Sequence, residues 1–112
     1  MMDELLKRIE RLEYYQQLLL EIVNTNDYPF TKLIIQKKLG PEEVLEFQQL
    51  CEYMNNKLQE QKAEGLLYFY PLLKEFSDKL NRKLEVKETV ESCLQQYLYV
   101  ELMTEFKKCL LG

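Results

Sequence analysis

The first predicted helix carries a regular pattern of apolar positions between residues 3 and 24. Alternating steps of four and three residues separate these positions, and this spacing places side chains along one seam of a coiled coil. A single polar residue, Gln16, interrupts the seam near its middle. The apolar members are Leu5, Ile9, Leu12, Leu19 and Val23. The pattern predicts a long amphipathic helix that begins near Asp3 and ends near Asn24.

The rest of the chain also shows helical periodicity, divided by proline and glycine. Proline fits the first turn of a helix, where its missing N–H would have no partner, and glycine suits the left-handed cap that follows a helix. Gly40 with Pro41, and later Gly65, mark such boundaries. We expect helices over 29–39, 41–64 and 71–81. A final helical region over 87–110 is either one helix or two, with the break at 97–99.

These elements predict an all-α fold: a bundle-like single domain over residues 1–112, with five or six helices and a long N-terminal amphipathic helix. A chain of 112 residues buries about 65% of its unfolded surface, which is enough for one thin core. The segment Leu66–Tyr70 is apolar on every side, so we expect it to be buried all round. Helix 41–64 should contribute a core stripe of Val44, Phe47, Cys51, Met54 and Leu58.

The first helix is more apolar than its seam alone requires. Leu18, Leu20 and Ile22 lie outside the seam, so the C-terminal half needs cover on more than one side. At about 1.5–3 kcal/mol for each fully buried leucine or isoleucine, five seam residues can offset the cost of association. We therefore predict that copies of the chain associate through this helix. The alternative is a central helix that is buried wholly within one monomer.

The composition of the seam bears on the number of copies. Ile and Val in one row with Leu in the other favour two strands, whereas Gln16 leaves a trimer open. Tyr15 joins the predicted interface because tyrosine offers a large apolar area with a polar tip. The predicted oligomer interface consists of Leu5, Ile9, Leu12, Tyr15, Gln16, Leu19 and Val23.

Few residues are candidates for catalysis. The chain contains no histidine, so Ser-His and Cys-His triads are excluded. Glu101 lies within an apolar stretch and Cys109 lies beside two lysines, but a solvated glutamate and a partly packed cysteine explain both more simply. Three dispersed cysteines do not supply the four ligands of a zinc site. We predict a non-enzymatic protein without a cofactor or a metal.

The charge balance limits the possible partners. A net charge of −4 opposes binding to nucleic-acid phosphates and to anionic membrane surfaces. Residues 31–50 are spaced like a helix-turn-helix unit, but its second helix begins with glutamates that would face DNA phosphates. The predicted partners are therefore the chain itself, as a dimer or trimer, and a second protein, with no nucleic acid and no membrane.

The same sequence features indicate a compartment. No stretch reaches the length of a membrane-spanning helix, and the charged N-terminus lacks the apolar core of a signal peptide. Cys51, Cys93 and Cys109 are odd in number and widely spaced, which does not form a disulfide framework. A reducing, cytoplasmic location is the prediction.

A second functional class remains open. The segments Leu66–Leu73 and Tyr97–Leu102 are rich in apolar and aromatic residues. If the fold brings them together, they would enclose a site for a small apolar ligand between helices. The alternative function is therefore a helical binder of such a ligand.

The run Thr89–Lys108 (TVESCLQQYLYVELMTEFKK), with Tyr28–Leu33 (YPFTKL) upstream, resembles the YhaI-like family of short, uncharacterised Bacillus proteins, which is a domain of unknown function. The resemblance extends over essentially the whole chain. It implies an all-helical cytosolic protein, and it implies no catalytic residues.

Overall fold

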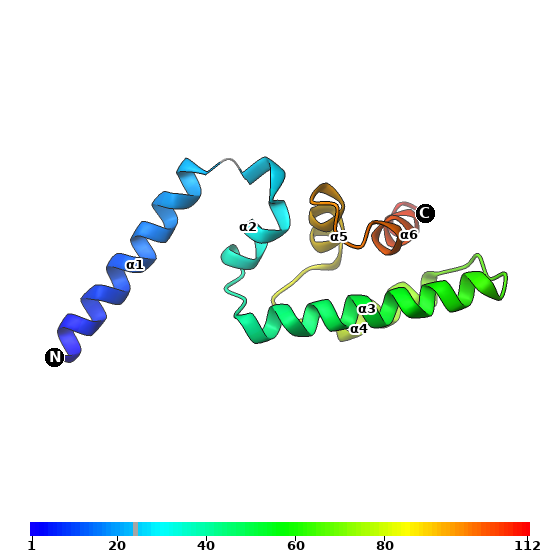
Figure 1. The fold of residues 1–112 in the computed structure, drawn as a ribbon, viewed down its shortest axis with the longest axis horizontal. Coiled ribbons are helices and arrows are strands. Elements are labelled where there is room, and N and C mark those ends of the chain that lie inside the picture. Colours follow the sequence, from blue (N-terminus) through cyan, green and yellow to red (C-terminus); the bar gives the residue numbers. More distant parts are fainter. Residues whose placement is uncertain (24) are drawn as a thin grey trace.

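The computed structural model describes residues 1–23 and 25–112 (Figure 1). Within these residues the chain is all-helical, which confirms the predicted fold class. The elements in chain order are α1 (Met2–Ile22), a short 3₁₀ helix η1 (Thr25–Asp27), α2 (Pro29–Gln36), α3 (Pro41–Ala63), α4 (Tyr70–Lys79), α5 (Val86–Gln95) and α6 (Val100–Leu111). The last helical region of the sequence is therefore two helices. The predicted end of the first helix, at Asn24, lies outside the described residues.

The hydrophobic core is built on the apolar stripe of α3. Phe47, Cys51, Met54 and Leu58 are all buried, as predicted, whereas Val44 near the start of the helix is half-buried. Helices α2, α4, α5 and α6 contribute most of the other buried side chains of the same cluster, and Phe69, Leu80 and Leu84 join it from the connections on either side of α4. One core therefore unites five of the described helices, and α1 contributes no residue to it.

A chain of phenylalanine rings connects four helices through this core. The ring centroids of Phe30 in α2 and Phe47 in α3 lie 4.9 Å apart, and Phe47 lies 6.5 Å from Phe76 in α4. Phe76 in turn lies 4.9 Å from Phe106 in α6. These separations fall in the favourable range for tilted or edge-to-face aromatic pairs. The rings thus fix the mutual positions of α2, α3, α4 and α6.

Helix α2 ends earlier than predicted. It ends at Gln36, because the next turn places Lys38 in the left-handed region with φ 59°. The N–H of Leu39 then donates to the carbonyl of Ile34 at 3.0 Å, which is the Schellman pattern of helix termination. Gly40, expected to take this left-handed position, is instead extended and precedes α3.

A remote side chain holds the first turn of α2. Gln96, just after α5, accepts through Oε1 from the backbone N–H groups of Phe30 at 2.8 Å and Thr31 at 3.0 Å. Its Nε2 donates to Oγ1 of Thr31 at 3.0 Å. The first N–H groups of a helix have no partner within the helix, so Gln96 caps α2 from a distant part of the chain.

Glu43 fixes the corner between α2 and α3. Its carboxylate accepts from the N–H of Gly40 at 3.1 Å, from Nζ of Lys83 at 2.8 Å and from Nδ2 of Asn81 at 2.8 Å. Lys83 Nζ also donates to the carbonyl of Lys38 at 3.2 Å. These hydrogen bonds, with that from Lys83 the largest cause, lower the pKa of Glu43 from 4.5 to about 2. The carboxylate joins this corner to the connection between α4 and α5.

A second acidic side chain joins α3 to α4. Glu75 accepts from Nζ of Lys57 and from Nζ of Lys79, each at 2.8 Å. Both ammonium groups also lie over the ring of Tyr53, at 5.0 and 4.5 Å from its centroid, within reach of a cation–π attraction. The hydrogen bonds, that from Lys57 first, lower the pKa of Glu75 to about 2.

The loop between α3 and α4 differs from the prediction. Leu66–Tyr70 was expected to be buried all round, but only Phe69 is buried and Leu67 is 87% exposed. The cause is that Gly65, with φ 83°, ends α3 and turns the chain along the surface. Leu66, Leu67 and Tyr68 are exposed in succession, and only Phe69 turns its side chain into the core.

Candidate interaction surface

Helix α1 carries an apolar face that the rest of the chain leaves uncovered. It spans 21 residues, and none of them is buried. In Figure 1 the helix projects away from α3, α4, α5 and α6. This placement excludes the alternative in which the first helix is the central helix of a monomer.

The shape of the molecule reflects this projection. Its extents are 62 × 27 × 19 Å, with a radius of gyration of 17.4 Å, whereas a compact domain of this length has a radius of about 13 Å. The difference is the length of α1 beyond the core. An elongated chain of this kind has more surface to cover than a globular one of equal mass.

The residues predicted from the heptad spacing all lie on α1 or directly after it, and all are exposed. The apolar ones and Tyr15 are between 43% and 67% exposed. Opposite-facing positions of the helix are mostly charged, with Lys7, Glu10 and Glu21 among them. The structure thus keeps together the predicted interface set: Leu5, Ile9, Leu12, Tyr15, Gln16, Leu19 and Val23.

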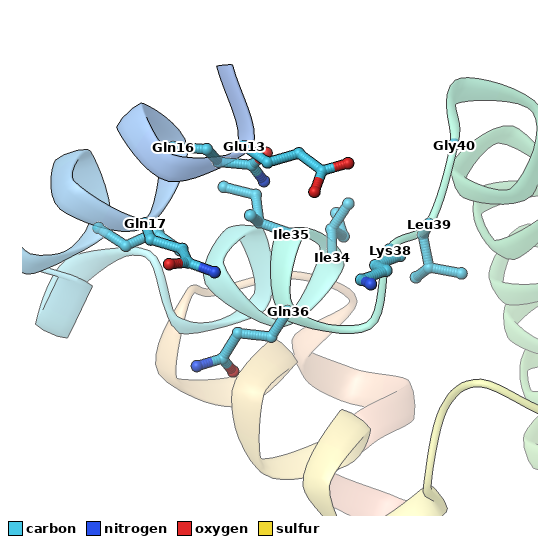
Figure 2. Close-up of a pocket in the computed structure, with 10 residues that line it drawn as sticks. Glu13, Gln16, Gln17, Ile34, Ile35, Gln36, Lys38, Leu39 and Gly40 are labelled. Atoms are coloured by element: carbon cyan, nitrogen blue, oxygen red, sulfur yellow. The ribbon is translucent and has the colours of Figure 1, made fainter. Parts of the chain in front are cut away.

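Beside this face runs an open groove between α1 and α2, with a volume of about 590 Å³ (Figure 2). The α1 wall consists of Glu13, Gln16, Gln17 and Leu20. Gln16 therefore belongs both to the heptad seam and to the groove. Opposite it lie side chains of α2 and the following turn, namely Ile34, Ile35, Gln36, Lys38, Leu39 and Gly40.

The α2 wall of the groove was not predicted as part of the surface. Ile34 is half-buried and packed against the core. Ile35 is half-exposed. The available signal was the run of three apolar residues from Leu33 to Ile35, since one helix face cannot bury three consecutive side chains.

The two catalytic candidates are occupied by ordinary interactions. Glu101 is paired with Nζ of Lys62 at 2.7 Å and accepts from Nε2 of Gln59 at 2.8 Å. The hydrogen bond from Lys62 is the main cause that lowers the pKa of Glu101. Burial raises the pKa of the half-buried Cys109 thiol, which opposes formation of a reactive thiolate.

The other two cysteines lie within the core. Cys51 and Cys93 are fully buried, and burial raises the pKa of both thiols, that of Cys93 to about 12. They pack as small apolar side chains, which the core stripe of helix 41–64 predicted for Cys51. Over the described residues, no group of three or more Asp, Glu, Cys or His side chains is placed to hold a metal ion.

The segments proposed for an apolar ligand do not share a cavity at the α3–α4 loop. A pocket of about 160 Å³ there is lined by residues 67–70 together with Glu105, Lys108 and Cys109. None of residues 97–102 lines it, and Tyr97, at the start of the second proposed segment, is 84% exposed. The pocket is smaller than the roughly 300 Å³ at which small-molecule sites begin.

Among the described helices, none has both the length and the apolar character needed to cross a bilayer.

Comparison with known protein families identifies a family that matches nearly the whole chain. The family model described as protein of unknown function (DUF1878) matches residues 2–111. The chain belongs to the DUF1878 family. The DUF1878 match includes every helix from α1 to α6, so the projecting α1 is part of the family's domain. The narrower likeness to YhaI-like Bacillus proteins stays a prediction.

Proposed function

We propose that this protein is a non-enzymatic, cytoplasmic interaction module whose copies associate through α1. The observation that carries this proposal is the apolar face of α1, interrupted only by Gln16, none of whose residues is buried by the rest of the chain. Large exposed apolar surfaces with polar borders are typical of interaction sites in water-soluble proteins.

The magnitude of the available burial supports association. Two copies of a five-residue apolar seam bring ten side chains together. These side chains are 43–67% exposed in one chain, so at about 1 kcal/mol each they contribute about 10 kcal/mol. The cost of association is about 4–15 kcal/mol, so the seam offsets a large part of this cost in a dimer, and a trimer buries more of it. Leu20, which is half-buried beside the seam, adds to this surface.

The proposed partners are a second copy of the chain and, on the remaining surface, another protein. Nucleic acid and anionic membrane are disfavoured by the net charge of −4 and by the acidic first turn of α3, which contains Glu42 and Glu43. The three free thiols are compatible with a reducing cytoplasm. No residue role in catalysis is part of this proposal.

The test is the molar mass of the protein by size-exclusion chromatography with light scattering, over a wide range of concentration. We expect a stable dimer or trimer. Leu12→Asp places a carboxylate in the seam, so we expect this variant to be a folded monomer. The matched control is Leu45→Asp on α3, because Leu45 is also more than half exposed and lies outside α1. A monomer of the unmodified protein at every concentration would refute the proposal.

A further inference from the structure

The residues on either side of the α1 seam favour one relative direction, parallel or antiparallel, for the α1 helices of two associated copies. Continuing the heptad register to the start of the helix places residues 2, 9, 16 and 23 at position a and residues 5, 12 and 19 at position d. Position e is then Leu6, Glu13 and Leu20. Position g is Met1, Arg8, Tyr15 and Ile22.

These flanking residues are complementary in a parallel, in-register pair. In that geometry, each g residue faces the e residue five positions later in the other copy. Arg8 then faces Glu13 of the second copy, and the pair has opposite charges. Apolar residues meet at the two other levels, where Met1 faces Leu6 and Tyr15 faces Leu20.

The flanking residues are not complementary in an antiparallel pair. Two antiparallel registers keep most of the seam in contact: the first places Leu5 opposite Val23, and the second places Leu5 opposite Gln16. In an antiparallel pair, e faces e and g faces g. The first register therefore brings Glu13 against Glu13, and the second brings Arg8 against Tyr15 and Glu13 against Leu6.

Gln16 also favours the parallel arrangement over the antiparallel ones. In the parallel register the two Gln16 side chains lie in the same layer, where each amide can donate to the other. In the antiparallel registers Gln16 faces either Leu12 or Leu5, which leaves its amide without a partner in the seam. A polar side chain at position a is known to fix the register and orientation of coiled coils for this reason.

The structure leaves the required side chains accessible. Arg8 and Glu13 are exposed, and neither takes part in the ion pairs of the described residues. Along position e, Leu6 and Glu13 are exposed, whereas Leu20 is half-buried beside the groove whose other wall is α2. Position e is therefore open at Leu6 and Glu13, where Met1 and Arg8 of a second copy would arrive.

We propose that the α1 helices of associated copies run parallel and in register, with Arg8 of one copy paired to Glu13 of the next. The proposal rests on the proposed function, because it assumes that copies associate through α1. It places all N-termini at one end of the assembly and the cores at the other.

The test is disulfide cross-linking of variants with one introduced cysteine in a Cys109→Ser background, in which the remaining Cys51 and Cys93 are fully buried. In the parallel pair, the two residues at position 5 lie at the distance that a disulfide bridges. In the antiparallel registers they are 18 or 11 residues apart along the axis, which is about 27 or 16 Å. Leu5→Cys alone should therefore cross-link, and so should Val23→Cys alone.

Mixtures of Leu5→Cys with Val23→Cys, and of Leu5→Cys with Gln16→Cys, report the antiparallel registers. We expect linked peptides that join residue 5 to residue 5, with at least tenfold less of the 5–23 and 5–16 links. An excess of the mixed links in an oligomeric sample would overturn the parallel direction and leave association through α1 intact. A monomeric sample, or an oligomer without any of these links, would overturn association through α1 itself.

Charge reversal supplies an independent readout. Arg8→Glu should weaken association about tenfold, because it places two acidic side chains together at each flank. The double variant Arg8→Glu with Glu13→Arg restores the opposite charges in the parallel register and should recover the association constant. A double variant that associates no better than Arg8→Glu alone would contradict the pairing.

Discussion

Among single residues, Glu43 accepts hydrogen bonds from two separate parts of the chain. It bonds to the backbone before α3 and to two side chains from the connection that follows α4. All three partners stabilise the ionised carboxylate, which is why its pKa is lowered to about 2. The side chain remains 28% exposed, so solvent weakens each of these interactions.

This carboxylate predicts the direction of acid destabilisation. The folded-state pKa lies below the ordinary value of 4.5, so the stability from Glu43 is fully present above pH 4.5. It is lost as the pH falls toward about 2. Chemical denaturation at a series of pH values should show this decline, and Glu43→Gln should make the profile flatter over that range.

Glu60→Gln is the matched control, because Glu60 is an exposed glutamate of the same helix. We expect its pH profile to follow that of the unmodified protein. Since Glu75 has a similarly lowered pKa, part of the acid decline should persist in Glu43→Gln. An unchanged slope in Glu43→Gln would show that its hydrogen bonds do not stabilise the fold.

At the residue scale, helical spacing predicted burial well only where the residues lie within one long helix. Phe47, Cys51 and Met54 could be placed in the core because α3 continues past them without a break. Tyr97 could not be placed, since its exposure follows from a left-handed turn at φ 61°. A left-handed residue after a helix is usually glycine, so a tyrosine at this position does not predict such a turn.

Among the elements, α2 depends most on the rest of the molecule. Its eight residues are fewer than the 12–15 or so at which an isolated helix becomes marginally stable in water. Buried contacts of Phe30 and Leu33 hold one side of it, and Gln96 holds its first turn. The orientation of α2, and with it one wall of the groove, is therefore determined near α5.

Removing the amide of Gln96 should loosen α2. Gln96→Ala leaves the N–H groups of Phe30 and Thr31 without this partner, so we expect a loss of about 1–2 kcal/mol in the free energy of unfolding, as for other caps. Urea denaturation measures the loss. Hydrogen exchange at residues 30 and 31 should accelerate more than exchange in α3.

Gln95→Ala is the matched control, because the neighbouring Gln95 is exposed at the end of α5. It should change the free energy of unfolding by less than half as much. Equal effects of the two substitutions would mean that α2 is held by its apolar contacts alone.

Heptad spacing sufficed to identify the α1 face, because its residues are regular along one helix and need no knowledge of the rest of the fold. The groove beside that face could not be predicted in the same way. Its second wall depends on a hydrogen bond between residues 66 positions apart, and spacing within a helix contains no information about such a contact.

For the whole molecule, the fold separates into a core and a projecting helix. Every buried hydrophobic residue lies between Phe30 and Phe106, within the part of the chain that the structure describes. Deletion of residues 1–22 should therefore leave a helical protein that unfolds cooperatively. Circular dichroism during heating tests the folding, and light scattering should show a monomer.

Two results would contradict this division. A deletion variant without a cooperative transition would mean that α1 is required for the core. A variant that remains oligomeric would place the contact between copies on the core surface, for example on the exposed loop around Leu67.

The hydrogen bonds between α2 and Gln96 also set an order of events during synthesis. The ribosome adds about 5–20 residues each second, so the 66 residues that separate Phe30 from Gln96 take about 3–13 s to appear. Residues of α1 leave the ribosome before Gln96 does, so α1 is exposed while the cap that orients α2 does not yet exist. With the association proposed above, neighbouring chains on one messenger RNA would be able to pair through α1 before either chain has completed its own core.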